Sequence, residues 1–203
     1  MLYYLYQLKP LFSPLNIFQY ITFRAAGAFM TALFVSLTTG PGIIRWLKTK
    51  KAQRIRADTP AGHQSKTGTP AMGGLIIYLA MTVGYLFWAR LTDRFVLLFL
   101  TTCTVLFLLG YADDYLKAKE HRKDGLSMAV KLGVQLILAL GIAAYLYIDP
   151  PNTLQAVSVS VPYSKEWFLH LGILYIPFCM MVLIGSSNAV NLADGLDGLA
   201  CGR

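Results

Sequence analysis

Charged side chains, cysteines and histidines are all scarce in this chain of 203 residues. Charged residues make up 14% of it, whereas an ordinary soluble domain carries about a quarter, so the composition argues against a soluble fold. Three cysteines do not suggest a disulfide framework, and we expect free thiols that act as small apolar residues. The three histidines form no metal-ligand spacing.

Several common signatures are also missing from the sequence. It has no P-loop, no G-x-G-x-x-G loop and no nucleophile elbow. The pair Asp113-Asp114 lacks the DDxxD pattern of soluble prenyl-chain synthases, because Lys117 occupies the last place. The first residues, MLYYLYQLKPLFSP, lack the basic leader of a cleavable signal peptide, and their tyrosines predict a short interfacial helix or anchor.

Apolar residues, at 56% of the chain, are instead gathered into blocks. Each block approaches the roughly 17 to 25 residues needed to cross the hydrocarbon core of a bilayer. A small soluble core has no room to enclose several such segments. The sequence therefore predicts an all-α polytopic membrane protein, forming a single integral membrane domain over residues 1–203. We expect about five transmembrane helices, at 17–39, 71–89, 95–112, 132–148 and 167–184.

The net charge of +8 would suit nucleic acid, but its distribution favours a membrane topology and no nucleic-acid partner. Basic residues cluster in the loop after the first span and in the loop after the third. Under the positive-inside rule both loops are cytoplasmic and the N-terminus lies outside. The two loops hold Arg45, Lys48, Lys50, Lys51, Arg54, Arg56 and Lys66, and then Lys117, Lys119, Arg122, Lys123 and Lys131.

The outer loop at 149–166 has a strand pattern of its own. Val157, Val159 and Val161 alternate there with Ser158 and Ser160. This is the period of a half-buried strand, and we expect a small external β-hairpin.

The first of three polar clusters is SKTGTPAMGG at 65–74, on the side that this topology makes cytoplasmic. Pro70 can begin the second span there, and Thr69 can cap it. The free N–H groups of that helix start, with the charge of Lys66, would attract an anion. An ordinary capped helix with glycines for close packing explains the same residues, so the sequence leaves both interpretations open.

The second cluster is Asp113-Asp114, at the predicted end of the third span. Like charges repel, and a helix C-terminus disfavours negative charge, so we expect cations beside the pair. Lys117 and Lys119 are one source of cations, and Mg²⁺ shared with substrate phosphates is another.

The third cluster is NAVNLADGLDGLA at 188–200, directly after the last apolar block. Its amides and carboxylates recur every third residue: Asn188, Asn191, Asp194 and Asp197. Gly195 and Gly198 predict a break in the helix or a close approach of ligand to backbone. Amides paired with carboxylates suit a nucleobase edge, a sugar or a Mg²⁺ shell, and a loop of polar caps between two spans is the alternative.

Three of these stretches stand in the order and spacing of a known family. They are GTPAMGG at 68–74, DDY at 113–115 and NAVNLADGLDGLA at 188–200, and FRAAGAFMTALFVSLTTGP at 23–41 is similar to that family's first span. The chain resembles the phospho-N-acetylmuramoyl-pentapeptide-transferase family along nearly all its length. The resemblance implies a Mg²⁺-dependent, multi-pass enzyme of the bacterial cytoplasmic membrane. Such an enzyme transfers phospho-N-acetylmuramoyl-pentapeptide from its UDP carrier to undecaprenyl phosphate, releasing UMP and forming lipid I for peptidoglycan synthesis.

The resemblance also implies roles for individual residues. As catalytic residues it implies Asp113, Asp114 and Asp197, and as metal ligands Asp113, Asp114 and Asn191. As substrate-binding residues it implies Lys66, Thr69, Lys117, Asn188, Asn191, Asp194, Gly195 and Leu196. Many members have a threonine where this chain has Ala193, which removes one hydroxyl and leaves the carboxylates in place.

The length departs from the family pattern. The expected spans are roughly half of the family's ten-helix fold, and the family's third active-site aspartate and His-rich loop are missing. We therefore expect a chain truncated at its C-terminus that carries half a site, with its own activity and a homodimeric state left open. One rival function is a UDP-N-acetylglucosamine:undecaprenyl-phosphate sugar-phosphate transferase. A transporter is the other, and it is disfavoured because the carboxylates gather at one interface instead of mid-bilayer.

Overall fold

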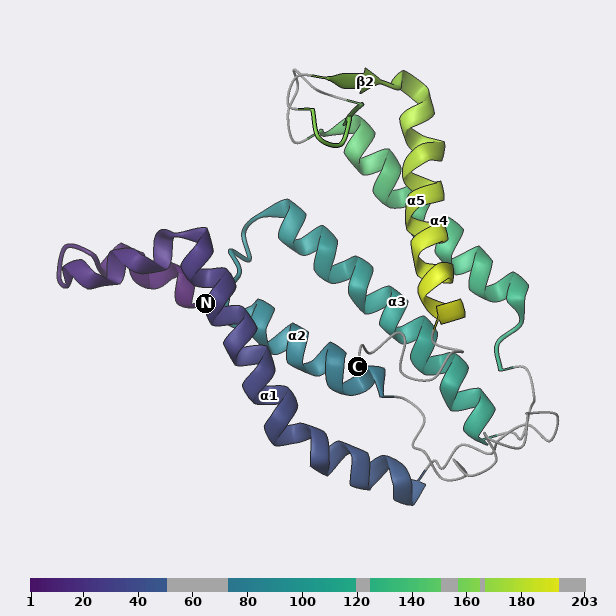
Figure 1. Cartoon of the computed structure of the whole chain (residues 1–203), viewed down its shortest axis with the longest axis horizontal. Helices are drawn as coiled ribbons and strands as arrows, with labels where there is room; N and C mark the ends of the chain where they lie inside the picture. The colour runs from purple at the N-terminus through teal and green to yellow at the C-terminus, as the bar shows by residue number, and fades with distance from the viewer. Residues whose placement is uncertain (51–72, 120–124, 151–156, 165–166, 194–203) are drawn as a thin grey trace. The chain divides into compact units, whose positions relative to one another are not determined.

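The computed structural model describes residues 1–50, 73–119, 125–150, 157–164 and 167–193. They form mainly helices, with one small antiparallel sheet (Figure 1). The α-helices are α1 (Ile21–Lys50), α2 (Gly74–Trp88), α3 (Arg94–Lys119), α4 (Met128–Ile148) and α5 (Tyr175–Ala193). The chain divides into two compact units, Met1–Leu126 and Ser127–Arg203. The single membrane domain stays a prediction.

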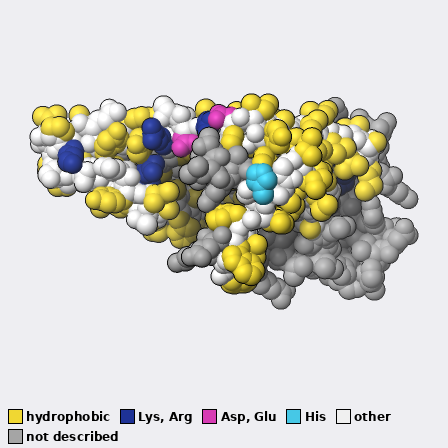
Figure 2. Space-filling view, turned by 90° about the horizontal axis from the view of Figure 1, so that it is seen from above, with side chains coloured by type: hydrophobic (Ala, Val, Ile, Leu, Met, Phe, Trp, Pro, Cys, Tyr) yellow, Lys and Arg dark blue, Asp and Glu magenta, His cyan; other side chains and the backbone are white. Residues whose placement is uncertain are grey.

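Four of the described helices are long and apolar enough to cross a membrane: Ile21–Leu47, Arg94–Lys117, Met128–Ile148 and Gly172–Val190. As described, α2 is apolar but shorter, at 15 residues. Hydrophobic side chains dominate the described surface in Figure 2. Phe34 and Ile137, for example, are 68% and 76% exposed. Faces of this kind are stable against lipid and not against water, so the predicted polytopic membrane protein is confirmed.

In the first unit, α1 and α2 pack closely through small residues. A Cβ added at Gly84 would lie 3.0 Å from the carbonyl oxygen of Ala28, and one at Gly27 would lie 2.5 Å from the ring of Trp88. Helices in lipid associate through such close approaches, because lipid chains are as apolar as leucine side chains.

The N-terminal segment, expected as a short helix, forms the 3-10 helices η1 (Leu2–Leu8) and η2 (Ser13–Gln19). Pro14 stands in the first turn of η2, where its missing N–H costs no hydrogen bond. Because η2 occupies the predicted start of the first span, α1 begins only at Ile21.

At its other end, α1 runs well past the apolar block at 17–39 and reaches Lys50. The helix continues through Pro41, although proline removes one backbone hydrogen bond. Just before it, the hydroxyl of Thr38 donates to the carbonyl of Phe34 at 2.8 Å. The apolar block marks the part of α1 that suits hydrocarbon and does not mark where backbone hydrogen bonding ends.

In the second unit, the expected small β-hairpin is present, and its external position stays a prediction. Strand β1 (Ser158–Ser160) pairs antiparallel with β2 (Phe168–His170), and Val159 lies opposite Leu169. The hydroxyl of Ser158 and Nδ1 of His170 are 2.9 Å apart, which adds a cross-strand hydrogen bond.

This pairing shows that the predicted start of the fifth span, at residue 167, is wrong. The apolar residues of β2 belong to the sheet, and Gly172 then takes a φ of +53° before the 3-10 helix η5 (Gly172–Leu174). Helix α5 begins at Tyr175. Pro177 falls in its first turn, where backbone N–H groups have no partner within the helix.

Candidate active site

Asp113 and Asp114 lie inside α3, because the helix continues to Lys119. The prediction that they close a helix is therefore wrong. A physical reason is the ion pair from Lys117 to Asp113, one turn apart, which favours helix beyond the apolar block. The unfavourable dipole effect is concentrated in the last turn, so it weighs less on this pair than the sequence suggested.

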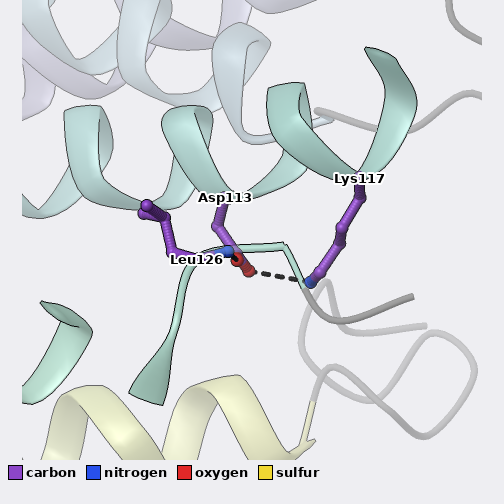
Figure 3. A network of polar contacts seen from close by, with 3 residues as sticks. All are labelled: Asp113, Lys117 and Leu126. Carbon is purple, nitrogen blue, oxygen red and sulfur yellow. Dashed lines mark hydrogen bonds and ion pairs between the residues drawn. The ribbon is translucent and has the colours of Figure 1, made fainter. Parts of the chain in front are cut away.

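Asp113 is buried and accepts hydrogen bonds from two of the described residues (Figure 3). It is 7% exposed. Its Oδ2 accepts from Nζ of Lys117 at 2.7 Å, and its Oδ1 accepts from the backbone N–H of Leu126 at 2.8 Å. A buried carboxylate is costly unless it is paired and hydrogen-bonded, and these contacts meet both conditions. Of the two sources of cations expected beside the pair, the lysine contact is therefore present in the structure.

Gly125 makes the second of these hydrogen bonds possible. Its φ is +55°, and an added Cβ there would overlap Oδ1 of Asp113 and lie 2.9 Å from Cε of Lys117. Only glycine fits both the backbone conformation and the space. Sequence reasoning missed Gly125 and Leu126, although the dipeptide Asp124-Gly125 is a turn signal.

Asp114 is half-buried at the next position of α3. Neighbouring side chains on a helix point about 100° apart, so the two carboxylates face different directions. This arrangement allows Asp113 to be held by the protein while Asp114 presents a second carboxylate on another side of the helix.

A row of aromatic rings leads along α3 to these carboxylates. Phe107, Tyr111 and Tyr115 follow one another at intervals of four residues, with ring centroids 5.9 and 6.3 Å apart. Tyr78 of α2 stacks on Phe107 at 4.0 Å, and its hydroxyl lies 2.9 Å from that of Thr104. These contacts fix α2 against α3 and so orient the part of α3 that carries Asp113.

In the second unit, Asn188 takes part in a polar contact between α4 and α5. Its Nδ2 donates to Oε1 of Gln135 at 3.0 Å and to the carbonyl of Ile184 at 2.9 Å. Gln135, which is 6% exposed, also donates from Nε2 to the hydroxyl of Ser187 at 3.1 Å. Substrate binding through the amide nitrogen of Asn188 would break these bonds, so that role stays a prediction.

Sequence reasoning also missed Gln135. Its signal was an uncharged polar side chain within an otherwise apolar block, where an unpaired amide is expensive in hydrocarbon. Such a residue is expected to have a hydrogen-bond partner on a neighbouring helix.

Of the remaining predicted site residues, the structure describes only some. Asn191 belongs to α5, which continues the helix past Asn188. Helix α2 begins at Gly74, after Gly73 and without a side-chain cap. Outside the described residues lie Lys66, Thr69, Asp194, Gly195, Leu196 and Asp197.

A Mg²⁺ ion shared with a substrate would need oxygen ligands from the described residues. Among them, no group of three histidine, cysteine or acidic side chains could hold a metal ion. Asp113 and Asp114 nevertheless supply two carboxylates, and Mg²⁺ in nucleotide enzymes is commonly bound by one or two carboxylates together with phosphates and water.

The family assignment follows from comparison with known proteins. The model of glycosyl transferase family 4 matches residues 96–203, more than half of the chain. The chain belongs to this family. The match to glycosyl transferase family 4 begins near the start of α3 and includes Asp113, Gln135 and Asn188.

Relatives with a more specific name cover the whole chain. It is 48% identical over 205 residues to a "Phospho-N-acetylmuramoyl-pentapeptide-transferase" of Endomicrobium trichonymphae, covering 100% of this chain and 57% of that protein. Proteins of the same name from Thermodesulfovibrio yellowstonii and Ruegeria pomeroyi are 43% and 44% identical, each across 98% of this chain. The resemblance expected from the motifs is thus confirmed. The chain spans a little over half the length of these curated relatives.

Proposed function

We propose that this protein is a Mg²⁺-dependent phospho-N-acetylmuramoyl-pentapeptide-transferase. Its substrates would be UDP-N-acetylmuramoyl-pentapeptide and undecaprenyl phosphate, and its products UMP and lipid I. The observation that carries the proposal is the 48% identity, across all of this chain, to the Endomicrobium relative of that name. Further support comes from Asp113, a buried carboxylate oriented by two hydrogen bonds.

In this proposal the ligands of the metal ion would come from Asp113, Asp114 and Asn191. Bound Mg²⁺ supplies charge neutralisation at the diphosphate as UMP departs. Lys117, which is 39% exposed at its side chain and paired with Asp113, provides a further positive charge for the donor phosphates. One carboxylate of the aspartate pair accepts the proton of the lipid phosphate, and Asp197 is a further catalytic carboxylate.

We further place the aspartate pair at the cytoplasmic face of the bacterial inner membrane. A soluble nucleotide and a lipid phosphate can meet only at a membrane interface. The basic residues around Arg45, Lys48 and Lys117 support the cytoplasmic side under the positive-inside rule. A homodimer stays a prediction, which light scattering on the detergent-solubilised protein would test.

The proposal is tested by the variant Asp114→Asn in the full-length enzyme. UMP release is measured with UDP-N-acetylmuramoyl-pentapeptide, undecaprenyl phosphate and Mg²⁺. We expect a loss of about a hundredfold or more, because the variant removes a metal-binding charge without changing the shape of the side chain.

Asp93→Asn is the matched control. Asp93 lies just before the opposite end of α3, where its Oδ1 accepts the backbone N–H of Phe95 at 2.9 Å. Asparagine can still cap a helix, so this variant should keep near-normal turnover. Equal activity of the two variants would refute the role of Asp114, and UMP release only with UDP-N-acetylglucosamine would replace the proposed donor.

A further inference from the structure

Two arginines face one tyrosine ring at one end of the unit Met1–Leu126. Arg24 lies in the first turn of α1, Arg90 follows the end of α2, and Tyr3 belongs to η1. Cζ of Arg24 is 4.7 Å from the centroid of the Tyr3 ring, and Cζ of Arg90 is 5.6 Å from it. Both distances are typical of cation–π contacts, so two positive charges share one aromatic partner.

Among the described residues, Arg90 has a neutral hydrogen-bond partner, because its Nε donates to the hydroxyl of Thr92 at 3.3 Å. Asp93, the carboxylate nearest to Arg90 in the sequence, accepts the N–H of Phe95. In the part of the chain that the structure describes, no ion pair joins Arg24 or Arg90 to a carboxylate. Nε of Arg24 is moreover buried without a hydrogen-bond partner. Like charges held against one ring repel each other, so an anion from outside the chain would stabilise this arrangement.

The surroundings of the arginines have the composition of a membrane interface. Trp88 stacks on Phe18 at 6.0 Å, lies edge-on to Phe23 at 5.7 Å, and donates from Nε1 to the hydroxyl of Thr31 at 2.9 Å. Tryptophan and tyrosine gather at the level of lipid head groups. Arg24 lies near the start of the apolar segment Ile21–Leu47, where an arginine can reach the head groups.

We propose that Tyr3, Arg24 and Arg90 bind the phosphate group of an anionic phospholipid. The planar guanidinium group matches the geometry of phosphate oxygens and donates several hydrogen bonds to them. Tyr20 and Ile21 beside the cluster are 58% and 74% exposed, which offers apolar surface to acyl chains and favours a lipid over free phosphate.

This lipid site is separate from the proposed active site. Arg90 precedes the first residue of α3, whereas Asp113 lies near the last turns of the same helix. The two ends are about 28 Å apart along the helix axis, roughly the thickness of the hydrocarbon core. The lipid would therefore bind in the leaflet opposite the one that supplies the lipid substrate.

The test uses the full-length protein in nanodiscs that contain phosphatidylglycerol or phosphatidylcholine, with retained lipid measured by native mass spectrometry. Arg90 is exposed, so Arg90→Gln removes a charge at the surface. Lys9→Gln is the matched control, because Lys9 is also an exposed cation and lies just after η1, which carries Tyr3. Arg24→Gln/Arg90→Gln extends the series.

We expect the wild type and Lys9→Gln to retain phosphatidylglycerol preferentially. Arg90→Gln should lower this retention about fivefold and the double variant further, with UMP release still measurable in each. Unchanged retention in Arg90→Gln would overturn the proposal, as would equal retention of phosphatidylcholine. Displacement of the lipid by inorganic phosphate alone would show a free-phosphate site and would also overturn it. None of these outcomes depends on which sugar the enzyme transfers.

Discussion

Replacing Gly125 by alanine is expected to displace the carboxylate of Asp113. The backbone cost of an L-residue at the φ of +55° is about 1–2 kcal/mol. The added methyl group also overlaps Oδ1 of Asp113, which must give up the N–H of Leu126. A hydrogen bond to a charged group contributes about 1.5–3 kcal/mol, so the full loss of stability is about 2.5–5 kcal/mol.

Gly172→Ala separates these two effects. Gly172 has a φ of +53° and nothing within 4 Å of an added Cβ. Its alanine variant therefore carries the same backbone cost, about 1–2 kcal/mol, and leaves Asp113 untouched. The difference between the two variants measures the contact with the carboxylate.

The comparison needs two assays on the full-length enzyme. Thermal unfolding in detergent, followed by intrinsic fluorescence, should give a lower midpoint for Gly125→Ala than for Gly172→Ala. UMP release should fall about a hundredfold in Gly125→Ala, since small misplacements of catalytic groups have effects of this size, and stay near wild type in Gly172→Ala. Equal midpoints and equal rates in the two variants would show that Gly125 does not position Asp113.

Two further predictions concern the second unit and the topology. Gln135→Leu should destabilise the protein by about 1–3 kcal/mol, because it removes the acceptor of one of the two hydrogen bonds that Asn188 donates. A double-mutant cycle of these two residues should give a coupling of about 0.6–1.7 kcal/mol in detergent unfolding, and additive effects would contradict the contact. Cysteines placed at Asp114 and at Asp194, which lies outside the described residues, should react with a membrane-impermeant thiol reagent from the same side in inverted vesicles. Labelling from opposite sides would end the proposal of a shared active site.

The apolar blocks predicted that helices exist but not where they end. Hydropathy reports which residues suit hydrocarbon, whereas a helix ends where its backbone hydrogen bonds find other partners. α1 and α3 therefore continue to Lys50 and Lys119, beyond their apolar blocks. Phe168–His170 were wrongly predicted to belong to the fifth span for a different reason. These apolar residues form a strand, because they pair with Ser158–Ser160, and the sequence pattern does not report that pairing.

Some residues of the candidate site were predictable from the sequence and others were not. Asp113 stood out in the sequence because adjacent carboxylates after an apolar block are unusual, and Lys117 was predictable from its spacing on the helix. Gly125 and Gln135 each carried a local signal, but the residues that they contact were not predictable from the sequence. Those neighbours come from packing, which the sequence pattern does not report.

The length of α3 makes the position of Asp113 depend on the thickness of the surrounding bilayer. With an arginine at its first residue and a lysine at its last, the helix resists sliding along the bilayer normal. A bilayer made thinner or thicker by its acyl chains therefore changes how far Asp113 stands from bulk water, or forces the helix to tilt. Under the proposed function, turnover should consequently pass through an optimum in acyl-chain length, at the membrane thickness that matches α3.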